Sequence, residues 1–424
     1  MIRDGGARIF RAPRASRVVD TLIVGAGQAG LALSHHLTAA GHEHVLLERG
    51  RVGQRWHERW DSLTLLSPNW MNRLPGDPDP VDRDGFLPLA AFAAHLESYA
   101  RALAAPVVEG VEVERIERFG PGFRVSATSG VWLARSVVLA TGDAAEPNMP
   151  LTPPREPLSL HSSEYRRPEL VPDGPVLVVG AGTSGQQLAL ELRQAGREVV
   201  LAAGRHSRAP RRYRGRDIFE WAHLLGDFDR TVDEMPDVEA AKRVPLFPLS
   251  GANGGEDLGL DRLAAAGVTV TGRLTGFDSR RAFFADDLAA NVAAADARLR
   301  KLLRRIDAHP LAEGWEPEPL PDVVLPPAAR TLDLRRFEAI VWATGFRRRY
   351  PWLHVPGVLD QRGEIVQRRG TTPVPGLYTL GLAYQYRRNS HFIGGVGRDA
   401  ETVARSIVER RAMRARSGML PVAV

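Results

Sequence analysis

The chain has 424 residues, of which 44% are hydrophobic and 25% charged, and it contains no cysteine. This length suits two or three domains, and the composition excludes a largely disordered chain. The absence of cysteine excludes disulfides, thiolate metal sites, cysteine nucleophiles and redox-active cysteine pairs. Because no apolar run reaches the roughly 20 residues of a membrane-spanning helix, no membrane span is expected.

The formal charge of +6 comes almost wholly from arginine, because Lys242 and Lys301 are the only lysines. The arginines are spread along the chain and form no basic stripe with interleaved aromatic residues, so no nucleic-acid partner is expected. Residues 1–17 are rich in arginine but lack the apolar core of a secretory signal. We therefore expect them to form a flexible N-terminal extension of a cytoplasmic protein.

A strand, a glycine turn and a helix are predicted in residues 18–40. The turn reads Gly25, Ala26, Gly27, Gln28, Ala29 and Gly30. In a dinucleotide-binding turn, Gly25 would permit the tight turn, Gly27 would let a diphosphate approach, and Gly30 would let the helix pack closely on the strand. Glu48 ends the next predicted strand, where a carboxylate can accept hydrogen bonds from ribose hydroxyls. This spacing predicts a dinucleotide site.

The same pattern recurs at residues 176–195. The second turn reads Gly180, Ala181, Gly182, Thr183, Ser184 and Gly185. The position that corresponds to Glu48 is Ala203, and Arg205 follows it closely, with Arg208, Arg211 and Arg212 behind. A missing acid and nearby guanidinium groups favour a 2′-phosphate, so we expect FAD at the first turn and NADPH at the second. The alternative is that these arginines reflect the composition of the chain.

Proline-rich stretches at 143–175 and 315–328 predict two crossings between domains. VVLATG at 137–142 and IVWATG at 340–345 are expected to close the two segments that flank the second unit. The predicted fold class is α/β, with two Rossmann-like dinucleotide-binding domains and the NADPH domain inserted in the FAD domain. The expected boundaries are 18–145 for the first part of the FAD domain, 146–335 for linker and insertion, and 336–424 for its C-terminal part.

Residues 286–308 lack glycine and proline and place leucines at helical spacing, which predicts an amphipathic helix. Ordinary packing of its apolar stripe is favoured over a partner-binding or lid role. No Ser/His/Asp triad and no metal-ligand spacing stands out, so no metal site is expected.

Taken in order, these motifs resemble the class B flavin-dependent monooxygenases, which include flavin-containing and YUCCA-like enzymes. The matching features are GAGQAG at 25–30, Glu48, GQRW at 53–56, DSLTLLSPNW at 61–70, LPG at 74–76, ATG at 140–142, GAGTSG at 180–185, ATGF at 343–346 and GGVGRDA at 394–400. The family fingerprint FxGxxxHxxx(Y/W) is matched by His161 and Tyr165, but Arg155 and Pro157 occupy its aromatic and glycine positions. His161 is interpreted either as an NADPH contact or as a hinge histidine bonded to backbone.

The resemblance also implies roles for residues outside the glycine turns. Flavin contacts are implied for Arg49, Gln54, Arg55, Trp56, Val113, Thr141, Gly142, Gly395 and Gly397. Asn69 is the candidate catalytic residue near the reactive edge of the flavin, with an ordinary turn residue as the alternative. A plain edge strand is the alternative for Val113. Candidates for a substrate cavity are Tyr384, Tyr386, Arg387, Arg388 and His391, which could equally be surface residues.

The resemblance implies that NADPH reduces FAD, that O2 adds at flavin C4a, and that one oxygen atom enters a small-molecule substrate. Heteroatom hydroxylation is the first expectation and oxidative decarboxylation of a 2-oxo acid the second. Two alternatives stay open: an NADPH oxidoreductase or oxidase that inserts no oxygen, and a non-catalytic redox-sensing flavoprotein. The oligomeric state is open between monomer and homodimer.

Overall fold

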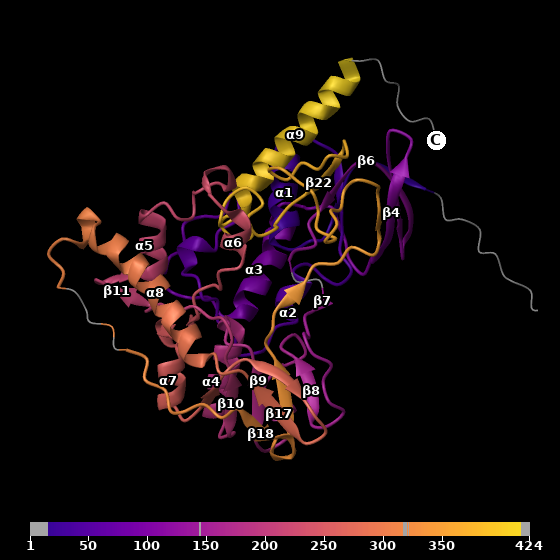
Figure 1. The fold of residues 1–424 in the computed structure, drawn as a ribbon. Helices are drawn as coiled ribbons and strands as arrows, with labels where there is room; N and C mark the ends of the chain where they lie inside the picture. The colour runs from indigo at the N-terminus through magenta and orange to yellow at the C-terminus, as the bar shows by residue number, and fades with distance from the viewer. Residues whose placement is uncertain (1–15, 144–145, 317–319, 321, 417–424) are drawn as a thin grey trace, which may run out of the picture.

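Two sheets with mostly parallel strands organise the chain, one in each half of the molecule (Figure 1). The computed structural model describes residues 16–143, 146–316, 320 and 322–416. The predicted extension 1–17 thus lies outside the described residues except for its last two, and Arg17 already begins the first strand.

The first sheet has eight strands, in the order β21-β4-β5-β6-β1-β2-β3, and β22 also pairs with β6. The strands are β1 (Arg17–Val24), β2 (His44–Leu47), β3 (Val107–Val108), β4 (Val113–Phe119), β5 (Gly122–Ala127), β6 (Gly130–Leu139), β21 (Leu353–His354) and β22 (Leu377–Thr379). β1 is parallel to β2 and β6, whereas β4, β5 and β6 are antiparallel to one another. Leu22 and Ile23 of β1 are fully buried, as expected for a central parallel strand covered on both faces.

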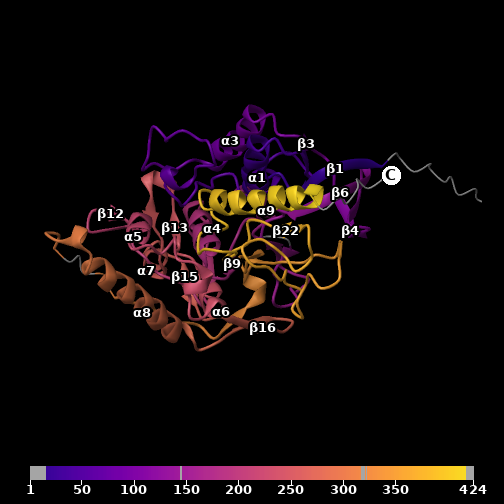
Figure 2. The ribbon, with the colours of Figure 1, turned by 90° about the horizontal axis from the view of Figure 1, so that it is seen from above.

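Three helices pack on one face of this sheet: α1 (Gln28–Ala39), α3 (Leu89–Ala102) and α9 (Val396–Arg416). Viewed from above, α9 lies alongside α1 (Figure 2). One buried cluster joins strand β1 to the three helices: it contains Ile23 of β1, Leu31 of α1, Leu96 of α3 and Val403 of α9. The last helix of the chain therefore completes the core of the first half.

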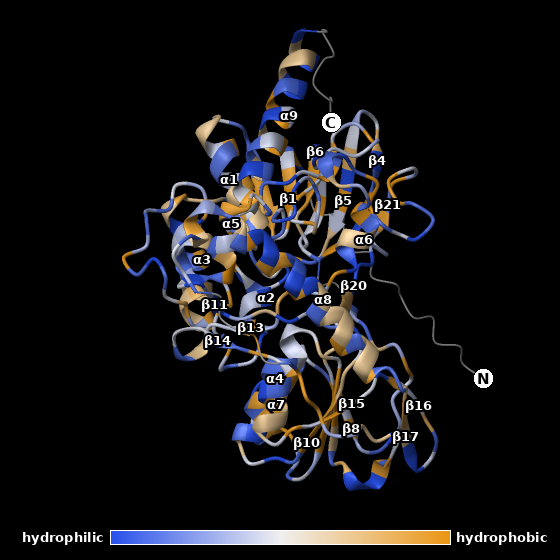
Figure 3. Ribbon diagram, turned by 60° about the vertical axis from the view of Figure 1, so that its left-hand side comes forward, coloured by the Kyte–Doolittle hydropathy of each residue, from blue (hydrophilic) through white to orange (hydrophobic). Residues whose placement is uncertain are grey.

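The second sheet has five strands, all parallel, in the order β15-β10-β9-β19-β8. They are β8 (Leu158–His161), β9 (Val176–Val179), β10 (Val199–Ala202), β15 (Thr269–Thr271) and β19 (Ala339–Trp342). Helices α4 (Thr183–Gln194) and α7 (Leu260–Ala265) cover one face. The antiparallel strands β16 (Leu274–Phe277) and β17 (Arg281–Phe284) cover the other, and β18 (Thr331–Asp333) pairs with β17. Figure 3 shows hydrophobic strands β10 and β15 inside this half. The predicted α/β class is confirmed, because helices cover two sheets whose strands are mostly parallel.

A helical region projects from the second half. Its elements are α5 (Ile218–Leu224), α6 (Val238–Lys242), α8 (Leu288–Asp307) and the short strands β11 (Arg212–Tyr213), β12 (Arg216–Asp217), β13 (Leu249–Ser250) and β14 (Glu256–Asp257). Short 3₁₀ turns lie at Asn69–Met71, Pro168–Leu170, Val232–Glu234, Ala252–Gly254, Pro310–Ala312 and Leu334–Arg336. The helix predicted at 286–308 is α8, and its apolar residues Leu299, Leu303 and Ile306 are buried against α5. The preferred interpretation of this stripe, ordinary packing, agrees with these contacts.

Two short antiparallel strands, β7 (Glu146–Pro147) and β20 (Phe346–Arg347), carry the chain between the halves. β7 lies within the first predicted crossing, at 143–175. β20 instead follows β19, so the chain does not return to the first half at 315–328 as predicted. The predicted boundary at 335/336 is wrong, because β19 pairs with β8 and β9 in the second sheet. Each ATG sequence thus follows a strand of its own sheet, β6 in the first and β19 in the second.

The buried His42 and the half-buried His44, behind α1, make stability sensitive to acid. His42 Nε2 lies 2.8 Å from the Thr21 hydroxyl and His44 Nε2 lies 2.8 Å from the Ser34 hydroxyl. Burial lowers the pKa of both histidines below the ordinary value of 6.5. The unfolded chain binds these protons first, so stability is fully present above pH 6.5 and decreases as pH falls toward the lowered pKa values. We expect Tm to fall between pH 7 and pH 5, and a His44→Gln variant to show a shallower decrease. An equal slope in that variant would contradict this assignment.

Candidate functional site

The first glycine turn is built as its sequence predicts. Gly25 has φ +106°, a conformation that favours glycine, and a Cβ there would lie 2.6 Å from the Ala140 carbonyl oxygen. A Cβ on Gly30 would lie 2.0 Å from the Gly25 carbonyl oxygen, so only glycine lets α1 pack this closely. Gly27 precedes α1 and has no atom within 4 Å of the position of a Cβ. Open space therefore faces the N–H groups of the first helical turn, which have no partner within the helix.

The second glycine turn repeats this geometry in the second sheet. Gly180 has φ +108°, and a Cβ there would lie 2.6 Å from the Ala343 carbonyl oxygen. A Cβ on Gly185 would lie 1.7 Å from the Gly180 carbonyl oxygen, and Gly182 is open like Gly27. Thr183 and Ser184 begin α4, with the Thr183 hydroxyl donating to the Phe247 carbonyl at 3.1 Å. The two turns thus have matching backbones, each backed by its own ATG strand.

A cavity of about 450 Å³ opens in front of the first turn. The predicted residues that line it are Gly25, Gly27, Gln28, Ala29, Glu48, Arg49, Gln54, Arg55, Trp56, Val113, Thr141 and Gly142. The structure therefore brings together most of the residues expected at the first site, from five separate segments of the chain.

Glu48 connects the end of β2 to the glycine turn. Its carboxylate accepts hydrogen bonds from the Ala26 N–H at 2.8 Å and from the Gly50 N–H at 3.1 Å. The side chain is buried at the cavity wall. Each carboxylate oxygen can accept more than one hydrogen bond, so the group can bind ribose hydroxyls while it holds the turn.

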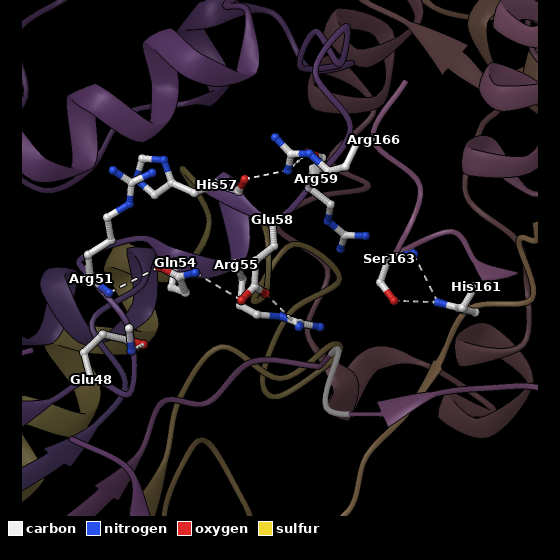
Figure 4. Close-up of polar contacts among 11 residues, drawn as sticks. Glu48, Arg51, Gln54, Arg55, His57, Glu58, Arg59, His161, Ser163 and Arg166 are labelled. Carbon is white, nitrogen blue, oxygen red and sulfur yellow. Dashed lines mark hydrogen bonds and ion pairs between the residues drawn. The ribbon is translucent and has the colours of Figure 1, made fainter. Parts of the chain in front are cut away.

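Helix α2 (Gln54–His57) forms another wall (Figure 4). Gly53 before it has φ +70°, and Trp56 Nε1 donates to the Gln28 side chain at 3.0 Å, which ties α2 to α1. Gln54 and Arg55 both bind Glu58, at 3.2 and 3.1 Å. These contacts fix the side chains that the resemblance places along the flavin.

Comparison with known proteins agrees with this architecture. A family described as pyridine nucleotide-disulphide oxidoreductase matches residues 22–216. An uncharacterized CzcO-like oxidoreductase of Geobacillus kaustophilus is 32% identical over 401 residues, covering 92% of this chain and 99% of that protein. The indole-3-pyruvate monooxygenase YUCCA1 of rice is 27% identical over 420 residues, covering 93% and 92%. The chain belongs to the class B flavin-dependent monooxygenase family.

The fold of this family member is also that of a solved structure. The flavin-containing monooxygenase of Stenotrophomonas maltophilia superposes with a TM-score of 0.63 at 22% identity, covering 93% of this chain and 99% of that one. The family is an oxidoreductase family whose cofactors are FAD and NADPH. The residues around both glycine turns fit them, because Gly27 and Gly182 leave open the space that a diphosphate needs.

Other predicted flavin-contacting residues of this monooxygenase lie outside the described cavity. Gly395 and Gly397 belong to the turn that begins α9, and the Gly394 N–H donates to the Met71 carbonyl at 2.9 Å. The structure therefore places this turn beside the 3₁₀ turn that Asn69 begins. Asn69 donates through Nδ2 to the Asp82 carbonyl at 2.9 Å, whereas its buried Oδ1 has no hydrogen-bond partner among the described residues. Its catalytic role stays a prediction.

His161 ends β8 and is fully buried. Its Nδ1 lies 2.8 Å from the Ser163 hydroxyl, its Nε2 lies 2.9 Å from the Gly345 carbonyl, and its ring packs edge-on against Phe346. Burial lowers its pKa, so the neutral ring donates through Nε2 to Gly345 at neutral pH. Because both ring nitrogens contact the protein, the geometry favours the hinge interpretation over a direct NADPH contact.

The arginines after β10 separate into two groups. Arg205 and Arg212 are exposed. Arg208 pairs with Asp296 at 2.8 Å, and the fully buried Arg211 pairs with Asp217 at 2.6 Å. Carboxylates already bind Arg208 and Arg211, so the structure does not favour the expectation that they offer guanidinium groups to NADPH.

Arg205 stays the predicted ligand of the 2′-phosphate. Replacing it with serine removes a charged hydrogen bond, and we expect the apparent KM for NADPH to rise about 10- to 100-fold with little change for NADH. Arg212→Ser is the comparison variant: Arg212 is the other exposed candidate, but it already donates to the Gly254 carbonyl, so we expect a smaller effect. Steady-state kinetics with both coenzymes measure the effect. Equal losses for NADPH and NADH would contradict the assignment.

Three of the five candidates for a substrate cavity make side-chain contacts within the described chain. The Tyr384 hydroxyl donates to the Ala241 carbonyl, and the guanidinium groups of Arg369 and Arg387 lie over the Tyr386 ring, at 4.4 and 4.2 Å from its centre. Arg387 pairs with the buried Asp399 at 3.1 Å. None of the five candidates lines the described cavity.

Sequence reasoning missed several residues that do line the cavity: Arg59, Asp143, Glu146, Arg349, Pro351, Trp352 and Gly381. Arg59 had a usable signal, because it stands four positions after Arg55. The others come from linkers and loops whose positions depend on the folded chain. No described helix has the length and apolarity to span a bilayer, and no described group of three acidic or histidine side chains offers a metal site.

Proposed function

We propose that this chain is an FAD-dependent, NADPH-consuming monooxygenase that inserts one oxygen atom from O2 into a small organic substrate. The observation that supports it most is the pair of matching dinucleotide turns in a chain without cysteine. Two cofactors of this kind transfer hydride from nicotinamide to flavin, and here no thiol or disulfide can take the electrons onward. Oxygen is the acceptor that the family uses.

The residues of the chain supply binding and orientation. Glu48 would bind the adenosine ribose, and the N–H groups at the start of α1 and α4 would bind the two diphosphates. The α2 side chains Gln54 and Trp56 would fix the flavin against the first half. When bound, FAD supplies the electron transfer and the reaction with O2, while the protein excludes water and positions the partners.

The substrate class is a separate part of the proposal. Heteroatom oxygenation of a small nucleophilic compound is our first proposal, and oxidative decarboxylation of a 2-oxo acid is the second. The second is supported by the name of the rice relative, an indole-3-pyruvate monooxygenase that aligns with 93% of this chain. A thioether and indole-3-pyruvate are therefore the two probes.

The test combines stopped-flow spectroscopy with isotope labelling. The purified FAD-containing protein is reduced with NADPH or NADH without oxygen, then mixed with ¹⁸O₂ and either probe. We expect faster reduction by NADPH, a delay before the oxidised flavin spectrum returns, and ¹⁸O in the product. Reduction by NADPH separates an enzyme from a redox-sensing flavoprotein, which needs no efficient hydride path.

The oxidase alternative has one supporting observation. Arg155 and Pro157 replace the aromatic residue and glycine of the family fingerprint, and Arg155 is exposed. Immediate reoxidation with one hydrogen peroxide per NADPH, with NADP⁺ present and no ¹⁸O in either probe, would support this alternative and contradict oxygen insertion.

A further inference from the structure

Arg59 lies where the two halves of the molecule meet. It follows helix α2 and lines the cavity in front of the first glycine turn. Its guanidinium also lies over the ring of Phe346, 5.2 Å from the ring centre. Phe346 is the third residue after Ala343, whose carbonyl backs the second glycine turn. Arg59 therefore contacts both the cavity at the first glycine turn and the segment after β19 that leads away from the second glycine turn.

The backbone of Arg59 is held in place from the inserted half. Arg166 donates through Nη1 to the carbonyl oxygens of His57, at 2.8 Å, and of Arg59, and through Nη2 to Asp61. Figure 4 shows Arg166 beside Arg59, with the Arg59 guanidinium extending between the α2 side chains and the labelled His161 and Ser163. The position of this cation is thus determined by contacts on both halves.

The Arg59 guanidinium has no hydrogen-bond or ion-pair partner among the described residues. Other arginines with low exposure have one: Arg208, Arg211, Arg214 and Arg387 all pair with aspartates. The charged groups that act on Arg59 are the cation of Arg55 and the carboxylate of Glu58, and Glu58 is already bonded to Arg55 and Gln54. Burial and the neighbouring Arg55 lower the pKa of Arg59. A cation in such surroundings is stabilised by an added anion.

We propose that Arg59 binds the diphosphate of a dinucleotide cofactor, as a cation held at the junction of the two halves. Guanidinium matches phosphate oxygens with paired N–H groups, and the open positions at Gly27 and Gly142 leave room on the facing wall. FAD and NADP contain the same diphosphate group, and Arg59 lies near both proposed cofactor sites. The experiment below therefore determines which of the two cofactors Arg59 binds. This inference rests on the proposed function, because it needs a bound dinucleotide.

The experiment uses the FAD-containing full chain and four variants. Arg59→Gln removes the charge, Arg59→Lys keeps the charge without the paired N–H groups, and Phe346→Leu removes the aromatic face. Arg51→Gln is the matched control, because Arg51 is exposed and outside the cavity and loses the same charge. FAD loss is followed by flavin fluorescence after dilution, and NADP⁺ affinity by the change in the flavin spectrum on titration.

We expect Arg59→Gln to weaken either FAD or NADP⁺ binding about 10- to 100-fold, Arg59→Lys to recover part of it, and Arg51→Gln to match the wild type. If Arg59→Gln loses FAD faster but binds NADP⁺ normally, the ligand of Arg59 is FAD. If it binds NADP⁺ more weakly but keeps FAD, the ligand is NADP. Unchanged binding of both, with Arg59→Gln and Phe346→Leu lowering Tm alike, would overturn the proposal in favour of a cation–aromatic contact. If the wild type binds both cofactors but oxygenates neither probe, the proposed function is contradicted while the proposed role of Arg59 is not.

Discussion

Replacing Gly185 with alanine is expected to slow flavin reduction by NADPH about 100-fold while the protein keeps its FAD. The new Cβ would lie 1.7 Å from the Gly180 carbonyl oxygen and 3.2 Å from the Ala343 Cβ. Both neighbours belong to rigid elements, the turn after β9 and the end of β19, so α4 must move away from the sheet. A displacement of about 1 Å can reduce a rate about 100-fold, and the overpacking costs about 1–3 kcal/mol. The rate is measured by anaerobic stopped-flow spectroscopy over a range of NADPH concentrations.

Substitutions at two further glycines distinguish an effect on NADPH binding from an effect on the stability of the fold. Gly182→Ala meets no atom within 4 Å and has an unstrained φ of −72°. It should leave Tm unchanged yet weaken NADPH binding, because its Cβ enters the space in front of α4. Gly276→Ala in β16 is equally unhindered but lies outside the turn, so it should change neither property. Normal NADPH kinetics in Gly185→Ala would show that the second turn is not the NADPH site.

The local features of both turns could be predicted from sequence because each depends on neighbours in the chain. Gly25 and Gly180 need a positive φ, and Gly30 and Gly185 must lack a Cβ for close packing. The strand at 176–179 has the predicted bounds, and the helix at 286–308 differs by two residues at its start and by one at its end. Such features need no knowledge of distant partners.

The place where the chain returns from the second half to the first could not be predicted from local sequence. IVWATG at 340–345 resembles VVLATG at 137–142, so the sequence indicates a strand followed by a turn but not the sheet that it joins. Pairing with β8 and β9, whose residues lie more than 150 positions earlier, decides it. Likewise, whether Arg208 is free to bind phosphate depends on Asp296, 88 residues away. Long-range pairing of strands and charges is absent from local patterns.

Replacing Arg211 with methionine is expected to lower the free energy of unfolding by about 3–5 kcal/mol, the typical cost of breaking a buried ion pair by removing one partner. Arg211 is 2% exposed, donates to the Leu66 carbonyl at 2.6 Å and lies over the ring of Phe86 at 4.3 Å. Leu66 and Phe86 belong to the first half and Asp217 to the second, so this side chain joins the halves. Chemical denaturation measures the loss, and the NADPH preference should stay unchanged.

The pH dependence of this loss identifies its cause. Burial raises the pKa of Asp217, and Arg211 partly offsets this, so the variant raises it further. An acid with a raised pKa in the folded state binds its proton more readily than in the unfolded chain, so the stability deficit should shrink as pH falls. Arg211→Met combined with Asp217→Asn should recover part of the loss, because asparagine keeps the N-cap hydrogen bond of α5 without the unpaired charge. A deficit independent of pH and unchanged in the double variant would instead assign the loss to packing against Phe86.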